Sequence, residues 1–199
     1  MYRFMRQLYT DGEFVRWISF IHDLLEELEM MYVWENQDRL TMRFPHFKAL
    51  VNAKLSASYD RWWRNELATN PKCGNYRLFK DTISFEHYIG VLNFRYVISL
   101  ARFRCRANEL PITKFLRDNN NRIDCLDLPL CSLCNDEIAD EFHFVLVCSH
   151  FRQQRCIYVK RYFYNNPNIL KFKALFAVKR VRELVNLAKF CEEIMRSFA

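Results

Sequence analysis

Residues 131–148 read CSLCNDEIADEFHFVLVC, which places three cysteines and one histidine within eighteen residues. From Cys131 and Cys134 to His143 and Cys148, the spacing is C-x2-C-x8-H-x4-C. Thiolate sulfur and imidazole nitrogen are the donors that Zn²⁺ prefers, and four of them complete a tetrahedral structural site. The stretch therefore predicts one structural Zn²⁺ bound by these four residues. We call residues 131–148 the cysteine–histidine segment.

The residues between the expected ligands predict how the segment folds. Asp140 and Glu141 favour a helix N-terminus just before His143, because negative charge is stabilised there. In an unbroken α-helix, the five steps from His143 to Cys148 turn through about 140°, so the two side chains would not face one ion. We therefore expect the helix to end near Cys148, with the apolar residues before it packed against the core.

Other interpretations of the cysteines stay open. They could be incidental buried thiols, since free cysteine often behaves as a small apolar residue. A redox C-x2-C pair is a second alternative, but it has no βαβ setting and leaves His143 and Cys148 unexplained. Cys125, His150 and Cys156 lie near enough to be substitute ligands, although their spacing favours structural roles.

The composition predicts a mainly α-helical protein. Of 199 residues, 51% are hydrophobic, so the chain can bury a core. Only three glycines are present beside 18 phenylalanines, and scarce glycine disfavours folds that need many positive φ angles. We expect a helical bundle-like region, a small CCHC zinc knuckle and C-terminal helices.

Three parts are predicted along the chain. They are a helical region over 1–116, the zinc knuckle over 117–150 and basic C-terminal helices over 151–199. Within them, apolar periodicity predicts helices that include 15–34, 45–67, 93–105 and 149–164, the last of these capped by Ser149.

Location is predicted from what the chain lacks. No run of eighteen apolar residues occurs, and the first residues have no apolar signal-peptide core. We expect an intracellular protein of the nucleus or cytoplasm, neither secreted nor membrane-bound. Its eight cysteines would then be reduced, which favours metal binding over disulfides.

Charge is distributed unevenly along the chain, whose net charge is +7. Residues 125–148 carry five acidic and no basic side chains, whereas residues 149–199 carry eleven basic and three acidic ones. A basic surplus suggests an anionic partner, of which nucleic acid is the commonest. RNA or DNA contacts are therefore expected from the flanks of the cysteine–histidine segment.

Arginines near aromatic residues are the best candidates for those contacts, because a guanidinium binds phosphate bidentately and stacks on bases. A solvated helix face is the competing interpretation for each of them. The candidates are Arg102, Arg104, Arg106, Arg152 and Arg155.

No catalytic pattern accompanies these features. The sequence contains no GxGxxG, GxxxxGK[ST] or GxSxG motif and no adjacent pair of aspartates. A zinc ion with four protein ligands also has no open position at which to activate water. We expect neither enzymatic activity nor a small-molecule substrate.

Residues 140–148 (DEFHFVLVC), with C-x2-C before them and residues 151–155 (FRQQR) after them, resemble the C-terminal end of non-LTR (LINE-like) retrotransposon reverse transcriptase polyproteins. Weaker similarity covers residues 32–37, 76–80 and 100–105 upstream, and residues 166–168 and the closing helix downstream, so the resemblance spans most of the chain from about residue 15.

The resemblance implies that Cys131, Cys134, His143 and Cys148 bind zinc and that the surrounding region helps to grip template RNA or target DNA. It also implies a C-terminal fragment, whose partner would be an upstream polymerase domain absent from this chain. Polymerase activity does not carry over, because it needs paired aspartates for two metal ions. The alternative is a zinc-stabilised protein-interaction module that does not bind nucleic acid.

Overall fold

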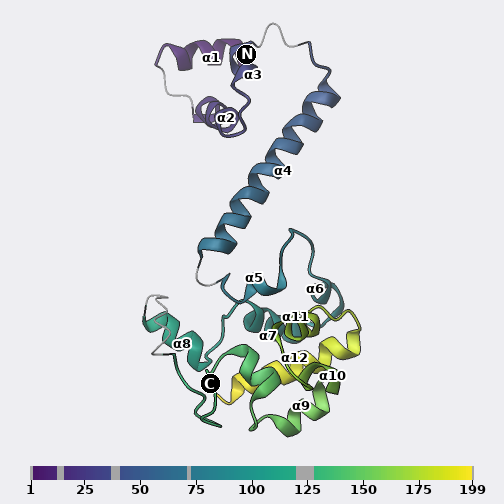
Figure 1. Ribbon diagram of the computed structural model, residues 1–199. Coiled ribbons are helices and arrows are strands. Elements are labelled where there is room, and N and C mark those ends of the chain that lie inside the picture. Colours follow the sequence, from purple (N-terminus) through teal and green to yellow (C-terminus); the bar gives the residue numbers. More distant parts are fainter. Residues whose placement is uncertain (1, 13–15, 37–40, 71–72, 120–127, 199) are drawn as a thin grey trace. The chain divides into compact units, whose positions relative to one another are not determined.

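The computed structural model describes residues 2–12, 16–36, 41–70, 73–119 and 128–198 (Figure 1). Over these residues the protein is mainly α-helical, as predicted, and the described part contains no β-strand. Leu130 and Ile138 form an isolated antiparallel bridge. In chain order, the elements are α1 (Tyr2–Thr10), α2 (Arg16–Glu27), α3 (Met31–Glu35), α4 (Phe44–Thr69), α5 (Tyr76–Phe79), α6 (His87–Val91), α7 (Phe94–Arg104), α8 (Pro111–Asp118), the π-helix η2 (His143–Val147), α9 (Arg152–Tyr158), α10 (Arg161–Tyr164), α11 (Ile169–Phe176) and α12 (Val181–Arg196).

Contacts divide the chain into two compact units, residues 1–65 and residues 66–199. The predicted boundaries after residues 116 and 150 both fall inside the second unit. One hydrophobic core in that unit draws on all three predicted parts, for example through Leu100, Cys131 and Leu187. The core of the second unit therefore extends across the predicted boundaries at residues 116 and 150.

The first unit has a small core of its own. Ile18 and Met30 are fully buried beside Leu25, Leu28 and Trp34. The helix predicted over 15–34 ends at Glu27 and resumes at Met31, because Glu29 adopts a left-handed φ of 55°. That break lets Trp34 pack back against the core of α2.

Helix α4 is close to the helix predicted over 45–67, and it begins one residue before Pro45. Proline suits the first turn of a helix, where its missing N–H would have no intrahelical acceptor. The first turns of α4 pack Phe47, Leu50 and Val51 against the core of the first unit.

Helices α7 and α12 pack together at the centre of the second unit, and α12 also contacts α9 and η2 (Figure 1). Leu100 and Phe103 of α7 lie in the same buried cluster as Leu187 and Ile194 of α12. The C-terminal helix therefore forms the surface on which the cysteine–histidine segment packs.

The helix predicted over 149–164 is two short helices, α9 and α10. Val159 and Lys160 between them have extended backbone angles. The first helix begins at Arg152, and no side chain caps it, so Ser149 is not its N-cap. None of the described helices is long and apolar enough to cross a membrane.

Candidate metal centre

The four predicted ligands come together in the folded chain. Cys131, Cys134, His143 and Cys148 each offer one ligand atom, and these atoms all lie within 4.8 Å of one another. Cys131, His143 and Cys148 are buried, whereas Cys134 is half-buried. The cluster therefore has the composition and closeness of a metal site enclosed by protein.

Its distances suit tetrahedral coordination. For a Zn–S bond of about 2.3 Å, tetrahedral angles place two sulfurs about 3.8 Å apart, and a sulfur and an imidazole nitrogen slightly closer. The Sγ atoms of Cys131 and Cys148 are 3.8 Å apart, and Cys134 Sγ lies 3.2 Å from His143 Nε2. These donors can hold one ion with little rearrangement.

A tight turn presents the first two cysteines. The backbone N–H of Asn135 donates to the carbonyl of Cys131 at 2.7 Å, and Asn135 takes a left-handed φ of 57°. Asparagine tolerates that conformation better than most residues. The N–H of Cys131 then donates to the carbonyl of Glu137 at 2.9 Å, which closes the loop. Both sulfurs are thereby directed to the same side.

The second pair of ligands lies at the two ends of a π-helical turn. The N–H of Cys148 donates to the carbonyl of His143 at 2.7 Å, five residues back, and the helix ends at Val147. The end near Cys148 was predicted, but the wider turn was not. A π turn needs more residues per revolution than an α turn, so ligands five apart come closer to one face. The H-x4-C spacing was the sequence signal for it.

Two carboxylates position His143. Asp140 Oδ1 accepts from the backbone N–H of His143 at 2.7 Å, as an N-cap does. His143 Nδ1 lies 3.3 Å from Glu137 Oε2. An ionised carboxylate only accepts, so Nδ1 carries the proton and Nε2 is left for a metal. The role of Glu137 was not predicted from the sequence, because its position between Cys134 and His143 follows no helix or strand periodicity that would direct it at the imidazole.

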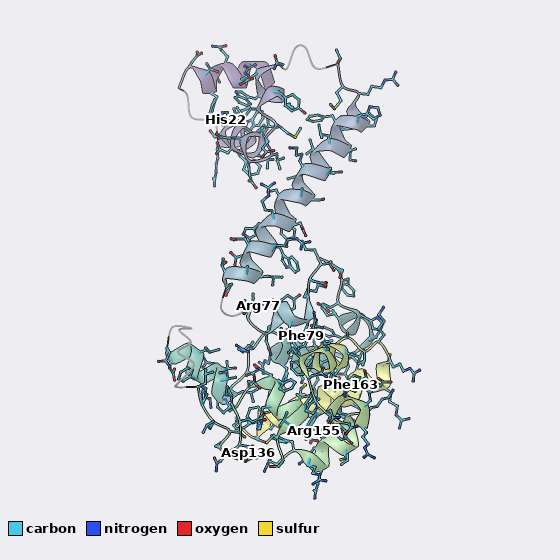
Figure 2. The ribbon with its side chains drawn as sticks, viewed as in Figure 1. His22, Arg77, Phe79, Asp136, Arg155 and Phe163 are labelled. Carbon is cyan, nitrogen blue, oxygen red and sulfur yellow. The ribbon has the colours of Figure 1, made fainter. Side chains whose placement is uncertain are left out.

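The end of the π turn is held by Arg155 of α9 (Figure 2). Its Nε donates to the Val145 carbonyl at 2.8 Å and its Nη2 to the Cys148 carbonyl at 2.7 Å. Longer bonds of 3.4 Å reach the carbonyls of Phe144 and Val147. The last carbonyls of a helix have no intrahelical donor, so one buried guanidinium satisfies all four.

Arg155 was predicted to contact nucleic acid, and the structure leaves little of its side chain at the surface for such a contact. The residue is only 5% exposed, and its donors are directed at backbone carbonyls. A cation at the C-terminal end of a helix is also favoured by the helix dipole. Arg155 therefore positions the metal-binding turn.

The charge state of the cluster depends on a cation. Burial, together with the nearby Cys131 sulfur, raises the pKa of the Cys148 thiol to about 12. Without a cation, the Cys148 thiol would thus stay protonated. A divalent ion removes this penalty, because it stabilises the thiolates that bind it.

A second buried network joins the cysteine–histidine segment to the end of α7 and the start of α8. Glu141 is 1% exposed and pairs with Arg106, whose Nε lies 3.3 Å from Glu141 Oε1. Asn108 also donates to Glu141 and accepts from Thr113. Helix α7 ends at Arg104, and Arg106 beyond it has a left-handed φ of 52°.

Arg104 is likewise not available to a partner. It is 4% exposed, pairs with Glu86 at 3.1 Å, and lies over the rings of Tyr88 and Phe79. A buried cation among aromatic faces and a carboxylate stabilises the fold locally. Little of Arg104 is therefore at the surface for the predicted contact with nucleic acid. Of the five candidate arginines, Arg102 and Arg152 are exposed.

The alternative ligands stay outside the cluster. Cys125 lies beyond the described residues, and His150 and Cys156 are exposed and do not belong to the group of four. A second group of possible donors, His22, Asp23 and Glu26, lies along α2 with both carboxylates exposed. Exposed acidic groups of that kind are common without an ion.

We predict that Glu137→Gln weakens metal binding by about tenfold, because the imidazole loses the carboxylate that orients it. Competition with a coloured zinc chelator measures the affinity. Asp136→Asn is the matched control, since it removes the same charge from the exposed neighbouring residue (Figure 2). An equal loss in both variants would show that charge, and not orientation, is responsible.

We predict that Arg155→Met lowers the free energy of unfolding by about 3 kcal/mol or more, because three buried carbonyls and one partly buried carbonyl lose this donor. Urea unfolding of the metal-loaded protein, followed by circular dichroism, measures this. Arg152→Met removes an exposed arginine three residues earlier and should change stability by less than about 0.5 kcal/mol. If the two variants unfold together, the carbonyl contacts carry no stability.

Comparison of the chain with protein-family models, with curated proteins and with solved structures finds no match. The chemistry of the centre is therefore inferred from its own donors and their surroundings.

Proposed function

We propose that this protein is a non-catalytic module built around one structural Zn²⁺, and that it binds the backbone of RNA or DNA. The observation that carries the metal assignment is the enclosed Cys₃His cluster with its 3.8 Å sulfur–sulfur distance. Three thiolates and one imidazole suit Zn²⁺ better than the oxygen-seeking Mg²⁺ or Ca²⁺.

The role of the ion would be to hold the second unit together. Cys131 and Cys148 lie in the same core as Phe103 and Phe190, so the cluster joins two loops to α7 and α12. With four protein ligands, the ion has no open position for water or substrate. It would stabilise the fold and not take part in a reaction.

Nucleic-acid binding is supported by the charge of the C-terminal helices. Residues 149–199 carry eleven basic and three acidic side chains. Most of these cations are exposed in the described residues, including Arg152, Arg161 and Arg182. Such a surface fits a polyanion, as does the resemblance to the C-terminal end of retrotransposon reverse transcriptases. A fragment of such a polyprotein, next to a polymerase domain, is the setting that we propose.

A protein-interaction module is the second candidate. The two residues of the isolated β-bridge, Leu130 and Ile138, are 61% and 39% exposed. They lie near the exposed acidic residues Asp136 and Glu137 in the sequence. An apolar patch rimmed by acidic residues fits a basic protein surface.

We predict about one zinc ion per chain in protein purified without chelator, and loss of that ion in Cys134→Ser. Elemental analysis gives the stoichiometry, and thermal unfolding should show a lower melting temperature after metal removal. Cys156→Ser is the matched control, because it removes an exposed thiol outside the cluster. Fully folded protein that contains no metal would contradict the assignment.

We predict that the protein binds labelled single-stranded RNA or DNA, with an affinity that falls about tenfold or more between about 50 and 200 mM salt. Fluorescence anisotropy measures the binding. Phosphate contacts release counterions, which is why the affinity depends steeply on salt. No binding at about 50 mM salt would contradict this function and favour the protein-interaction module.

A further inference from the structure

A cavity of about 680 Å³ lies where α9, α10 and the end of η2 meet. Both short helices contact η2, so the cavity borders the turn that carries Cys148. Its wall includes Arg152, Arg155 and Arg161 on the polar side and Leu146 and Pro167 on the apolar side. The cavity thus combines positive charge with apolar surface.

None of the residues that line this cavity is acidic. The three acidic residues of 149–199 are engaged elsewhere: Glu183 pairs with Lys160, Glu192 pairs with Arg95, and Glu193 accepts from Tyr158. Arg152 and Arg161 are exposed, and neither forms an ion pair within the described part of the chain. Their charge is therefore not neutralised by the protein.

Arg155 adds a positive charge whose position is fixed. Its guanidinium is held by the carbonyls of η2, so it cannot reach an anion through most of its donors. The proposed zinc centre, with three thiolates, would carry a net charge of about −1 and offset one of the three arginines. Two positive charges remain, which matches a phosphate group.

The apolar side suits an organic ester better than a bare ion. The ring of Tyr164 lines the cavity, and its hydroxyl is held 3.6 Å from Cys156 Sγ. Leu146, Val147 and Pro167 complete this side. A sugar or base attached to the phosphate would find apolar and aromatic contacts there.

Other cavities of the second unit differ in charge. The one between α7 and α12 is lined by Arg95, Arg102 and Arg196 but also by the carboxylates of Glu109 and Glu192, and Glu192 pairs with Arg95 and Arg196. The one beside α6 contains Arg104 and Lys80, which both pair with Glu86. In both cavities, carboxylates of the lining pair with some of these cations, whereas no carboxylate lines the cavity between α9 and α10.

We propose that the cavity between α9 and α10 binds a phosphate ester, with Arg152 and Arg161 as its direct ligands and Arg155 as a fixed charge behind them. The inference rests on the proposed function for the source of the ester, namely the backbone of RNA or DNA. A free nucleotide offers the same chemistry, and the experiment separates the two sources.

The test is nuclear magnetic resonance of the zinc-loaded, nitrogen-15-labelled full chain. Inorganic phosphate, adenosine 5′-monophosphate and a short single-stranded oligonucleotide are titrated in separate series. We expect shifts centred on Ser149, Arg152, Arg161 and Asn165 with all three probes, and tighter binding of the two esters than of phosphate. Saturation of these residues by the oligonucleotide at lower concentration than by the nucleotide identifies the nucleic-acid backbone as the source. The reverse order identifies a free nucleotide.

Paired variants make the test specific. Arg152→Ala with Arg161→Ala should weaken binding of each probe at least tenfold, because two charge-assisted contacts are lost. Lys173→Ala with Lys189→Ala is the control, since it removes the same charge from exposed lysines that do not line the cavity. It should change binding less than twofold. Zinc content and melting temperature confirm that both variants are folded.

An equal loss in the two double variants, or shifts spread evenly over the basic helices, would overturn the inference. If the oligonucleotide binds but shifts residues elsewhere, the cavity is not its site, although the proposed function stands. If only the nucleotide and phosphate bind in the cavity, the inference stands and the nucleic-acid function falls.

Discussion

The hydrogen bonds from Arg155 to the carbonyls at the end of η2 are the interaction on which the second unit depends most. Three buried carbonyls and one partly buried carbonyl accept hydrogen bonds from this one guanidinium. With them satisfied, the chain can leave the helix at Cys148 while that residue stays fully buried. The same guanidinium fixes α9 against the turn, so the position of one metal ligand and the start of the basic helices are set together.

The π-helical turn follows from the ligand spacing. His143 and Cys148 are five residues apart, and on an α-helix side chains with that spacing lie on different faces. The wider turn closes through the N–H of Cys148 and the carbonyl of His143. Such turns are less stable than α turns, and they persist where something else holds them. Here Asp140 caps the beginning and Arg155 satisfies the end.

The charged residues before and after that turn differ in sign. The cysteine–histidine segment contains no lysine or arginine. Within it, Glu137 orients His143 and Glu141 pairs with Arg106. After Cys148 the surplus is positive, and exposed cations such as Arg152 lack acidic neighbours in their cavity. A cysteine–histidine cluster in an acidic segment and a surface of exposed cations are thus adjacent in the second unit.

The sequence by itself determined the mainly α-helical fold, the four clustered donors and the end of the helix near Cys148, because these depend on composition and on local spacing. It also placed a long helix close to the observed α4. Only the tertiary structure decided which arginines face solvent. Arg102 and Arg104 are two residues apart on α7, yet one is exposed and the other is buried against Glu86. The role of Arg155 could not be predicted either, because its partners are backbone carbonyls, which every sequence offers and which only the folded chain brings to one side chain.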